Sequence, residues 1–320
     1  MLYARKLLLP IEFSEMSYLA ASWSLGVARK LGIQEVHLVH VVLMNPSPRI
    51  SAISERVQYG QEIRDSIPPS FMEPWESLTQ QVIQEGFRLR IDVLEANDIT
   101  NVLVSYAESH LIDLIALNTH ARTGFAFESL GSVAKNLIRH APCPVLTLRV
   151  GDQQLYNTQS IQQILVPIDF SDRSKQAVRI ARSLAERMGG EITAFHVEPV
   201  AGETTQHSRW EREYNASHPN ATQTPKLVDF LHAASGPRVT CHTAPLFGEL
   251  VPATLQYLAR YQHDLIVIGT HEYRQDGFGF TQSMTERLIQ LAPCPVLSFR
   301  PSSRSLIEFH NPQQEHLIHG

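Results

Sequence analysis

Short apolar runs alternate along the chain with longer segments in which apolar residues return every three or four positions. The runs are rich in Val, Ile and Leu, a composition typical of strands buried on both faces of a parallel sheet. In the first half of the chain the predicted strands are KLLLPI at 6–11, VHLVHVV at 36–42, RLRIDVL at 88–94, DLIALN at 113–118 and PVLTLR at 144–149.

The segments between these runs predict amphipathic helices. In the first of them, Leu19, Trp23 and Val27 form an apolar stripe. Ser14 stands before the stripe as a candidate N-cap, and Gly32 stands where the helix would end. Strands that alternate with helices imply right-handed crossovers, so the pattern predicts an α/β fold with a doubly wound, open parallel sheet of the Rossmann-like kind.

The whole pattern occurs twice. Four blocks of the first half return in the same order in the second half, at offsets of 151 to 157 residues. The pairs are LLLPIEFSEMS at 7–17 with ILVPIDFSDRS at 164–174, VHLVHVV at 36–42 with ITAFHVE at 192–198, DLIALNTH at 113–120 with DLIVIGTH at 264–271, and HAPCPVLTLR at 140–149 with LAPCPVLSFR at 291–300. The chain is therefore predicted to be a tandem duplication, with one domain at 1–150, a second at 160–301 and a C-terminal tail at 302–320.

The last strand of each copy lies in the best preserved block. Such a strand would end its sheet, and its unpaired backbone groups need a partner. We therefore expect Val145–Leu148 to face Val296–Phe299 around a pseudo-two-fold axis, so that the two copies pair within one chain. Protein partners and further oligomerisation stay open at this point.

Two Pro-, Ser- and Asn-rich segments differ most between the copies. Residues 44–75 and 199–225 are predicted to run over the surface as loops before a helix resumes. The polar link at 150–163 is short, so we expect it to hold the two domains close together.

Composition excludes several classes of protein. Hydrophobic residues make up 43% of the 320 residues and charged residues 18%, which indicates a globular chain. The formal net charge is -5 and no basic stripe is present, which argues against nucleic acid as a partner. No apolar stretch is long enough for a membrane span, so we expect a cytoplasmic protein. Cys143 and Cys294 are interpreted as buried structural thiols, because neither they nor Cys241 form a CxxC pair.

Ligands of open α/β sheets bind beyond the carboxyl ends of the strands, where the strand order reverses. In copy one this location collects Glu12 after the first strand, His40 and Val41 in the second, and the loop that follows the fourth. The sequences VPIDFS and GTH, with a Gly-Ser pair ahead of HAPCPVL, resemble the universal stress protein family. The resemblance covers both halves of the chain, as in tandem members of that family, and implies adenine nucleotide alpha hydrolase-like domains.

Family members that bind ATP carry a loop of the form G-x2-G-x9-G-[S/T], and an Asp after the first strand holds the ribose. Glycines let backbone amides approach phosphates, and the final Gly-Ser pair opens a helix whose N-terminus favours anions. The resemblance implies contacts to ATP or AMP from Pro10, Ile11, Glu12, Val41, Asn118, His120, Ala121, Gly131, Ser132 and Val133 in copy one, and from Asp169, Val197, Gly269, His271 and Ser283 in copy two.

Copy one departs from this motif moderately. Asn118 and Ala121 stand at the first two glycine positions, whereas Gly131 and Ser132 are kept. Asn tolerates left-handed backbone, but Ala121 adds a methyl group where a phosphate would pass. Glu12 takes the place of the Asp.

Copy two departs more severely. It keeps Gly269 and Asp169 but has Glu272 and Gln282 at the other glycine positions. A carboxylate about 4 Å from a phosphate costs roughly 4 kcal/mol at an effective dielectric near 20. That energy equals about three decades of affinity. We therefore expect nucleotide or small-ligand binding in copy one rather than in copy two.

No residue is assigned a catalytic role. His120 and His271 share one loop position, but no carboxylate partner is identifiable for either. The chain has no Walker lysine and no nucleophile elbow, so we interpret it as a non-enzymatic stress-response or signalling protein. Two alternatives stay open, a slow ATP-hydrolysing enzyme and a scaffold with vestigial clefts that acts through protein partners. His316 and His319 in the tail are not taken as metal ligands.

Overall fold

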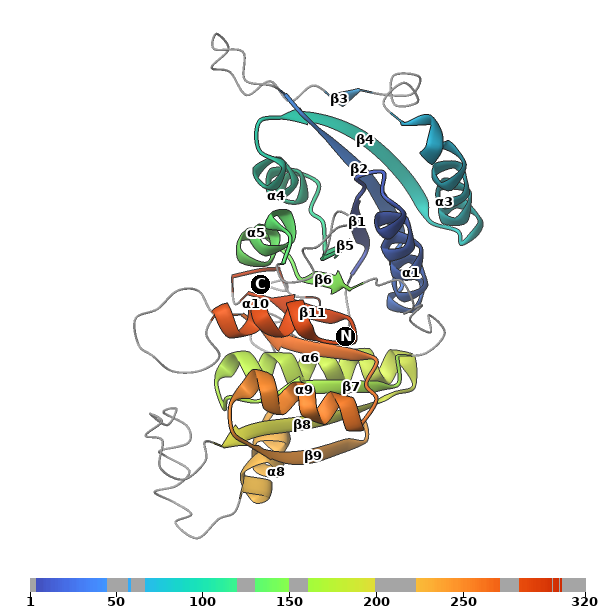
Figure 1. Cartoon of the computed structure of the whole chain (residues 1–320). Coiled ribbons are helices and arrows are strands. Elements are labelled where there is room, and N and C mark those ends of the chain that lie inside the picture. The colour runs from blue at the N-terminus through green and yellow to red at the C-terminus, as the bar shows by residue number, and fades with distance from the viewer. Residues whose placement is uncertain are drawn as a thin grey trace, which may run out of the picture.

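The computed structural model shows the two copies joined in one continuous layer of strands (Figure 1). It describes residues 4–44, 57–58, 67–119, 130–149, 161–198, 223–270, 282–300, 302–304 and 306. Within these ranges every helix is too short or too polar to span a membrane.

Copy one contains six strands, four α-helices and one 3-10 helix among its described residues. In chain order they are β1 (Lys6–Pro10), α1 (Glu15–Leu31), β2 (Glu35–Leu43), β3 (Val57–Gln58), η1 (Pro69–Phe71), α3 (Met72–Gln84), β4 (Arg88–Ala96), α4 (Ile99–Ser109), β5 (Leu114–Asn118), α5 (Ser132–His140) and β6 (Val145–Leu148).

Copy two repeats this order without counterparts of β3 and η1 in its described residues. Its elements are β7 (Gln163–Pro167), α6 (Asp172–Met188), β8 (Glu191–Glu198), α8 (Gln223–Ala233), β9 (Cys241–Phe247), α9 (Leu250–Arg260), β10 (Leu265–Gly269), α10 (Gln282–Leu291) and β11 (Val296–Phe299).

The sheet has eleven strands in the order β3-β4-β2-β1-β5-β6-β11-β10-β7-β8-β9. Within each copy the main strands are parallel, and the strand order reverses between β1 and β5 and again between β7 and β10. This topology confirms the predicted doubly wound fold. It also locates one topological switch point in each copy, which is where such sheets bind ligands.

The two copies join through their last strands. β6 pairs with β11 in antiparallel orientation, and Leu146 lies opposite Leu297. These two leucines are equivalent residues of the duplication, 151 positions apart. The pairing of Val145–Leu148 with Val296–Phe299 is therefore confirmed, and the pseudo-two-fold axis passes between Leu146 and Leu297.

Helices cover both faces of the sheet. Alternate residues of a strand point to opposite faces, so Leu7 and Leu9 of β1 pack in one cluster and Leu8 packs in the other. The first cluster contains side chains of α1, α3, α6 and α8, and the second contains those of α4, α5, α9 and α10. Each cluster runs across both copies, so the duplicated halves share their cores.

Local chemistry sets the ends of the first helix of each copy. Ser14 caps α1 with a complete capping box, and Ser171 caps α6. Gly32 and Gly189 end these helices in the left-handed conformation, with φ of 77° and 69°. The predicted ends of the first helix, at Ser14 and Gly32, are confirmed.

Two helices begin earlier than the sequence predicted. α3 starts at Met72, inside the segment expected to be a loop, and buries Trp75. α8 starts at Gln223, also inside an expected loop. Pro74 and Pro225, which favoured the loop interpretation, lie in the first helical turn, where a residue needs no backbone N–H for the helix. The short strand β3 also lies in the first of these segments.

The first residues of the predicted tail return to copy one. The backbone N–H of Arg304 donates to the carbonyl oxygen of Pro142 over 2.7 Å, and its guanidinium donates to Ala107. Leu306 is fully buried. The described start of the tail is therefore packed against the fold.

Candidate functional site

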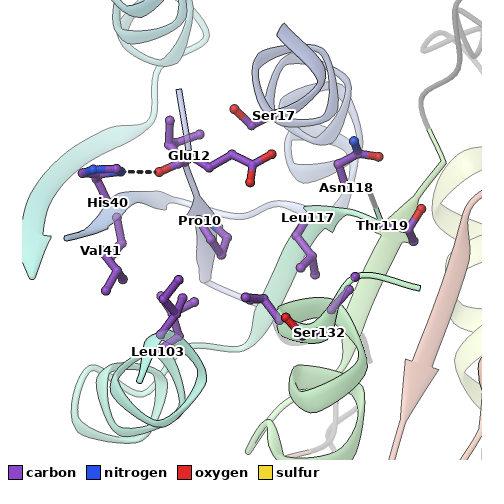
Figure 2. A pocket seen from close by; sticks show the side chains of 16 residues that line it. Pro10, Glu12, Ser17, His40, Val41, Leu103, Leu117, Asn118, Thr119 and Ser132 are labelled. Carbon is purple, nitrogen blue, oxygen red and sulfur yellow. Dashed lines mark hydrogen bonds between the residues drawn. The ribbon is translucent and has the colours of Figure 1, made fainter. Parts of the chain in front are cut away.

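A cavity of about 150 Å³ opens at the switch point of copy one, beyond the carboxyl ends of β1, β2 and β5 (Figure 2). It is bounded by the first turns of α1, α4 and α5. Its lining residues are Pro10, Ile11, Glu12, Ser17, Val39, His40, Val41, Ile99, Leu103, Leu117, Asn118, Thr119, Gly131, Ser132, Val133 and Ala134.

The fold brings most of the predicted copy-one residues together at this cavity. Those that line it are Pro10, Ile11, Glu12, Val41, Asn118, Gly131, Ser132 and Val133. His120 and Ala121 lie outside the described residues. The grouping comes from four segments that are distant in sequence, because the carboxyl ends of parallel strands meet at one edge of a sheet.

The cavity has an apolar side and a polar side. Val41 and Leu103 lie on one side in Figure 2, whereas Asn118, Thr119 and Ser132 lie on the other. A flat apolar group would fit the first side, between β2 and α4. A charged or hydrogen-bonding group would fit the second, beside α5.

The N-terminus of α5 forms the polar side. Gly131 is its N-cap and has no side chain, so among the described residues no side-chain cap occupies the first amides of the helix. The N–H of Gly131 donates to the carbonyl oxygen of Thr119 over 3.0 Å. A Cβ at this position would lie only 3.0 Å from the same oxygen, so glycine is what permits this approach. Such a helix start favours an anion.

Glu12 brings a negative charge to the mouth of the cavity. Its side chain is exposed, and Oε1 accepts a hydrogen bond of 2.8 Å from the Ser14 hydroxyl. The next residue, Phe13, has a φ of 54°, which is uncommon for a non-glycine residue and marks a tight turn between β1 and α1. Phe170 repeats this conformation in copy two with a φ of 59°. The turn after the first strand therefore has the same backbone conformation in both copies.

His40 supports the floor of the site. Because the carbonyl oxygen of Ile11 can only accept, the 2.7 Å contact requires a hydrogen on Nδ1 of His40. Burial lowers the pKa of His40, which keeps the imidazole neutral. His196 makes the equivalent 2.6 Å contact to Ile168 in copy two. These histidines tie the second strand to the end of the first in each copy.

The switch point of copy two is more crowded around its described residues. Asp169 is only 8% exposed, and its Oδ1 accepts hydrogen bonds from the hydroxyls of Ser171 and Ser174. A Cβ on Gly269 would lie 3.2 Å from Arg173 and 3.2 Å from the Phe299 ring. Asp169 is thus held by the start of α6, whereas Glu12 reaches solvent.

The remaining predicted residues of copy two are less fully described. Val197 is half-buried in β8. Ser283 belongs to α10, but its side chain lies outside the described part, as do His271 and Glu272.

Sequence reasoning missed several lining residues. They are Ser17, Val39, Ile99, Leu103, Leu117, Thr119 and Ala134. Val39, Leu117 and Thr119 adjoin predicted positions, so the alternation of the strands could have indicated them. Ile99 and Leu103 belong to the helix after β4, and their approach depends on how that helix crosses the sheet.

The thiols of Cys143 and Cys294 are buried and protonated, so neither is an activated nucleophile. Burial raises the pKa of Cys143 and of Cys294 to about 12, so both stay protonated at neutral pH. This agrees with their interpretation as structural residues. Within the described ranges, no three His, Cys, Asp or Glu side chains are grouped so that they could hold a metal ion.

Comparison with known proteins identifies the repeated unit. The model of the universal stress protein family matches residues 4–149 and again residues 160–300. Universal stress protein MJ0531 of Methanocaldococcus jannaschii is 27% identical over 145 residues, which cover 45% of this chain and 82% of that protein. Universal stress protein Rv2005c of Mycobacterium tuberculosis is 34% identical over 88 residues, which cover 28% of this chain and 30% of that protein.

A solved structure supports the same architecture along nearly the whole chain. The crystal structure of a universal stress protein from Archaeoglobus fulgidus covers 92% of this chain and 98% of its own, with a TM-score of 0.64 and 19% identity. At that identity the likeness concerns the fold alone.

Proposed function

Because this chain belongs to the universal stress protein family, with two copies of the family domain in tandem, we propose that it is a non-enzymatic binding protein whose ligand site is the copy-one cavity. The proposed ligand is an adenine nucleotide, ATP or AMP, held weakly. The observation that carries the proposal is that one cavity combines an apolar side with the start of α5, where no side chain of the described residues caps the helix.

The two sides of the cavity suit the two ends of such a ligand. A purine base is flat and mostly apolar, and Val41 and Leu103 offer an apolar surface for it. A phosphate is an anion, and the amides after Gly131 offer hydrogen-bond donors and the positive end of the helix dipole. Glu12 is placed between the two, where a carboxylate accepts hydrogen bonds from hydroxyl groups such as those of a ribose.

Weak binding follows from the size and charge of the site. Pockets that enclose a small ligand usually measure about 300–1,000 Å³. The cavity formed by the described residues is about 150 Å³. The carboxylate of Glu12 also repels a phosphate that strays toward the mouth. We therefore expect affinity in the micromolar range or weaker.

Calorimetric titration with ATP and with AMP tests this function. Val41→Trp would fill the apolar side of the cavity and should abolish the binding heat. Val197→Trp places the same side chain at the equivalent position of copy two and is the matched control. Loss of binding in the copy-one variant alone supports the proposal, and loss in the copy-two variant alone would move the site to the other switch point.

The same titration separates the alternatives. Absence of heat in the wild-type protein would contradict nucleotide binding and favour a scaffold that acts through protein partners. Release of ADP or phosphate above the rate in buffer, abolished by Val41→Trp, would contradict the non-enzymatic interpretation and favour slow hydrolysis.

A further inference from the structure

The two copies meet along a seam that is built from equivalent residues. The hydroxyl of Thr147 donates to the carbonyl oxygen of Val296 over 3.1 Å. Its equivalent in copy two, Ser298, donates to the carbonyl oxygen of Val145 over 3.3 Å. The contacts are reciprocal, as expected for residues on either side of a two-fold axis.

Arginines that follow the paired strands repeat this reciprocity. Arg149 donates to the carbonyl oxygen of Leu291, the last residue of α10, over 3.3 Å. The equivalent Arg300 donates to His140, the last residue of α5, over 3.2 Å, and to Ala141 over 3.0 Å. Each guanidinium thus caps the C-terminus of a helix in the other copy, where a cation is favoured.

The equivalent helices α5 and α10 meet at the seam but differ in charge, so the contacts between them do not follow the pseudo-two-fold symmetry. Nε of Arg139 lies 2.6 Å from Oε1 of Glu286, and Nζ of Lys135 lies 3.6 Å from Oε2. Lys135 and Glu286 are equivalent residues of the duplication, and the equivalent of Arg139 is Gln290. The Glu286 side chain is 11% exposed, so its charge is largely removed from water and depends on these partners.

We propose that this charge pair makes the seam selective, so that a copy-one surface fits a copy-two surface and neither fits a second surface of its own kind. If two copy-one surfaces met through the same seam, Lys135 and Arg139 would face a second Lys and Arg with no carboxylate between them. If two copy-two surfaces met, Glu286 would face a second Glu. The strands, the hydroxyls and the capping arginines suit every combination, whereas the charges suit the mixed one.

Both wrong combinations can be recreated inside the full chain. Glu286→Lys with Gln290→Arg gives the seam the charges of two copy-one surfaces, and Lys135→Glu with Arg139→Gln gives it those of two copy-two surfaces. Amide hydrogen exchange of peptides that contain Val145–Leu148 and Val296–Phe299 reports opening of the seam. We expect each variant to speed this exchange by at least tenfold, because breaking a largely buried ion pair costs more than the free energy that a factor of ten represents.

The charge-swapped chain decides between pairing and mere loss of a side chain. It combines Lys135→Glu, Arg139→Gln, Glu286→Lys and Gln290→Arg, so the pair is restored with its sign reversed. Exchange within about twofold of the wild-type rate is expected. Exchange as fast as in the two separate variants would overturn the proposal. This outcome is decisive even if the separate variants unfold globally, because the restored pair should then restore the fold.

Two further variants complete the test. Glu286→Gln removes the charge without reversing it and should fall between the wild type and the variant with Glu286→Lys and Gln290→Arg; equal rates in the two variants would show that the sign of the charge is irrelevant. Lys175→Glu breaks an ion pair within α6 that lies away from the seam. In this pair Nζ of Lys175 lies 3.4 Å from Oδ1 of Asp172. The substitution should leave exchange at the seam unchanged, and faster exchange would attribute the effect to net charge instead.

Discussion

The hydroxyl of Tyr106 lies 2.7 Å from Nδ1 of His37, in the layer between α4 and the sheet of copy one. Nε2 of His37 contacts Glu35 over 2.8 Å, and Tyr106 also donates to Asp92. His37 and Asp92 are both 0% exposed. A polar network is thus buried where apolar packing would be expected. At the equivalent place in copy two, Tyr257 stacks on the ring of Phe195 instead.

Tyr106→Phe should destabilise copy one. The substitution removes the hydroxyl that both His37 and Asp92 contact, and leaves two buried polar groups with a lost partner. Such a loss costs about 1–3 kcal/mol. Urea unfolding followed by circular dichroism would measure it. Tyr257→Phe is the matched control in copy two and should lower the free energy of unfolding less. Equal losses in the two variants would indicate that the network does not stabilise the fold.

Acid should weaken the fold between pH 7.5 and 5.5. Burial lowers the pKa of His40 and His263. In the unfolded chain these side chains titrate near about 6.5, so unfolding takes up protons in this window. The free energy of unfolding therefore falls as the pH falls, by at most about 1.4 kcal/mol per pH unit for each histidine.

Urea midpoints measured at pH 7.5, 6.5 and 5.5 would reveal this dependence. His263→Gln should make it shallower, because one of the two proton-linked groups is gone. A midpoint that is constant or rises toward pH 5.5 would contradict the prediction.

The leucines at the pseudo-two-fold axis should be energetically coupled. Leu146 and Leu297 are register partners in the same apolar cluster. Leu146→Ala and Leu297→Ala each leave a cavity, at a cost of about 2–5 kcal/mol. Because the residues are neighbours, the double variant should lose less than the sum of the single losses. Thermal unfolding of all four proteins measures the coupling, and strict additivity would speak against contact at the axis.

Adjacent glycines after α6 should respond differently to alanine. Gly189 has a φ of 69° with open space around its Cα, so Gly189→Ala meets only the left-handed backbone preference, about 1 kcal/mol. A Cβ on Gly190 would lie 2.6 Å from the backbone oxygen of Gln162, which has to move. Gly190→Ala should therefore lower the melting temperature considerably more than Gly189→Ala, and the reverse order would contradict this packing.

Much of the fold could be predicted from the sequence because its determinants are local or repeated. Val, Ile and Leu runs specify strands wherever they occur, and Ser14 and Gly32 act on the backbone next to them. The last strands could be paired in advance because an edge strand needs a partner and the duplication supplies one. Prolines misled the prediction at Met72 and Gln223, because the same residue suits a loop and a first helical turn.

About half of the copy-one cavity was foreseeable, since Glu12, Val41 and Asn118 stand at strand ends that the topology must gather. The position of Leu103 at the cavity was not foreseeable. The sequence of a helix shows which of its faces is apolar, but not which strand end that face covers.

The sequence by itself determined that the chain contains two doubly wound domains, where their strands lie and which strands join them. These properties follow from apolar periodicity, local capping and repetition, which are all readable along one dimension. Only the tertiary structure decided that Tyr106 meets His37 and that Lys135 meets Glu286. Such contacts depend on the distance between side chains of different elements, and packing rather than sequence spacing sets that distance.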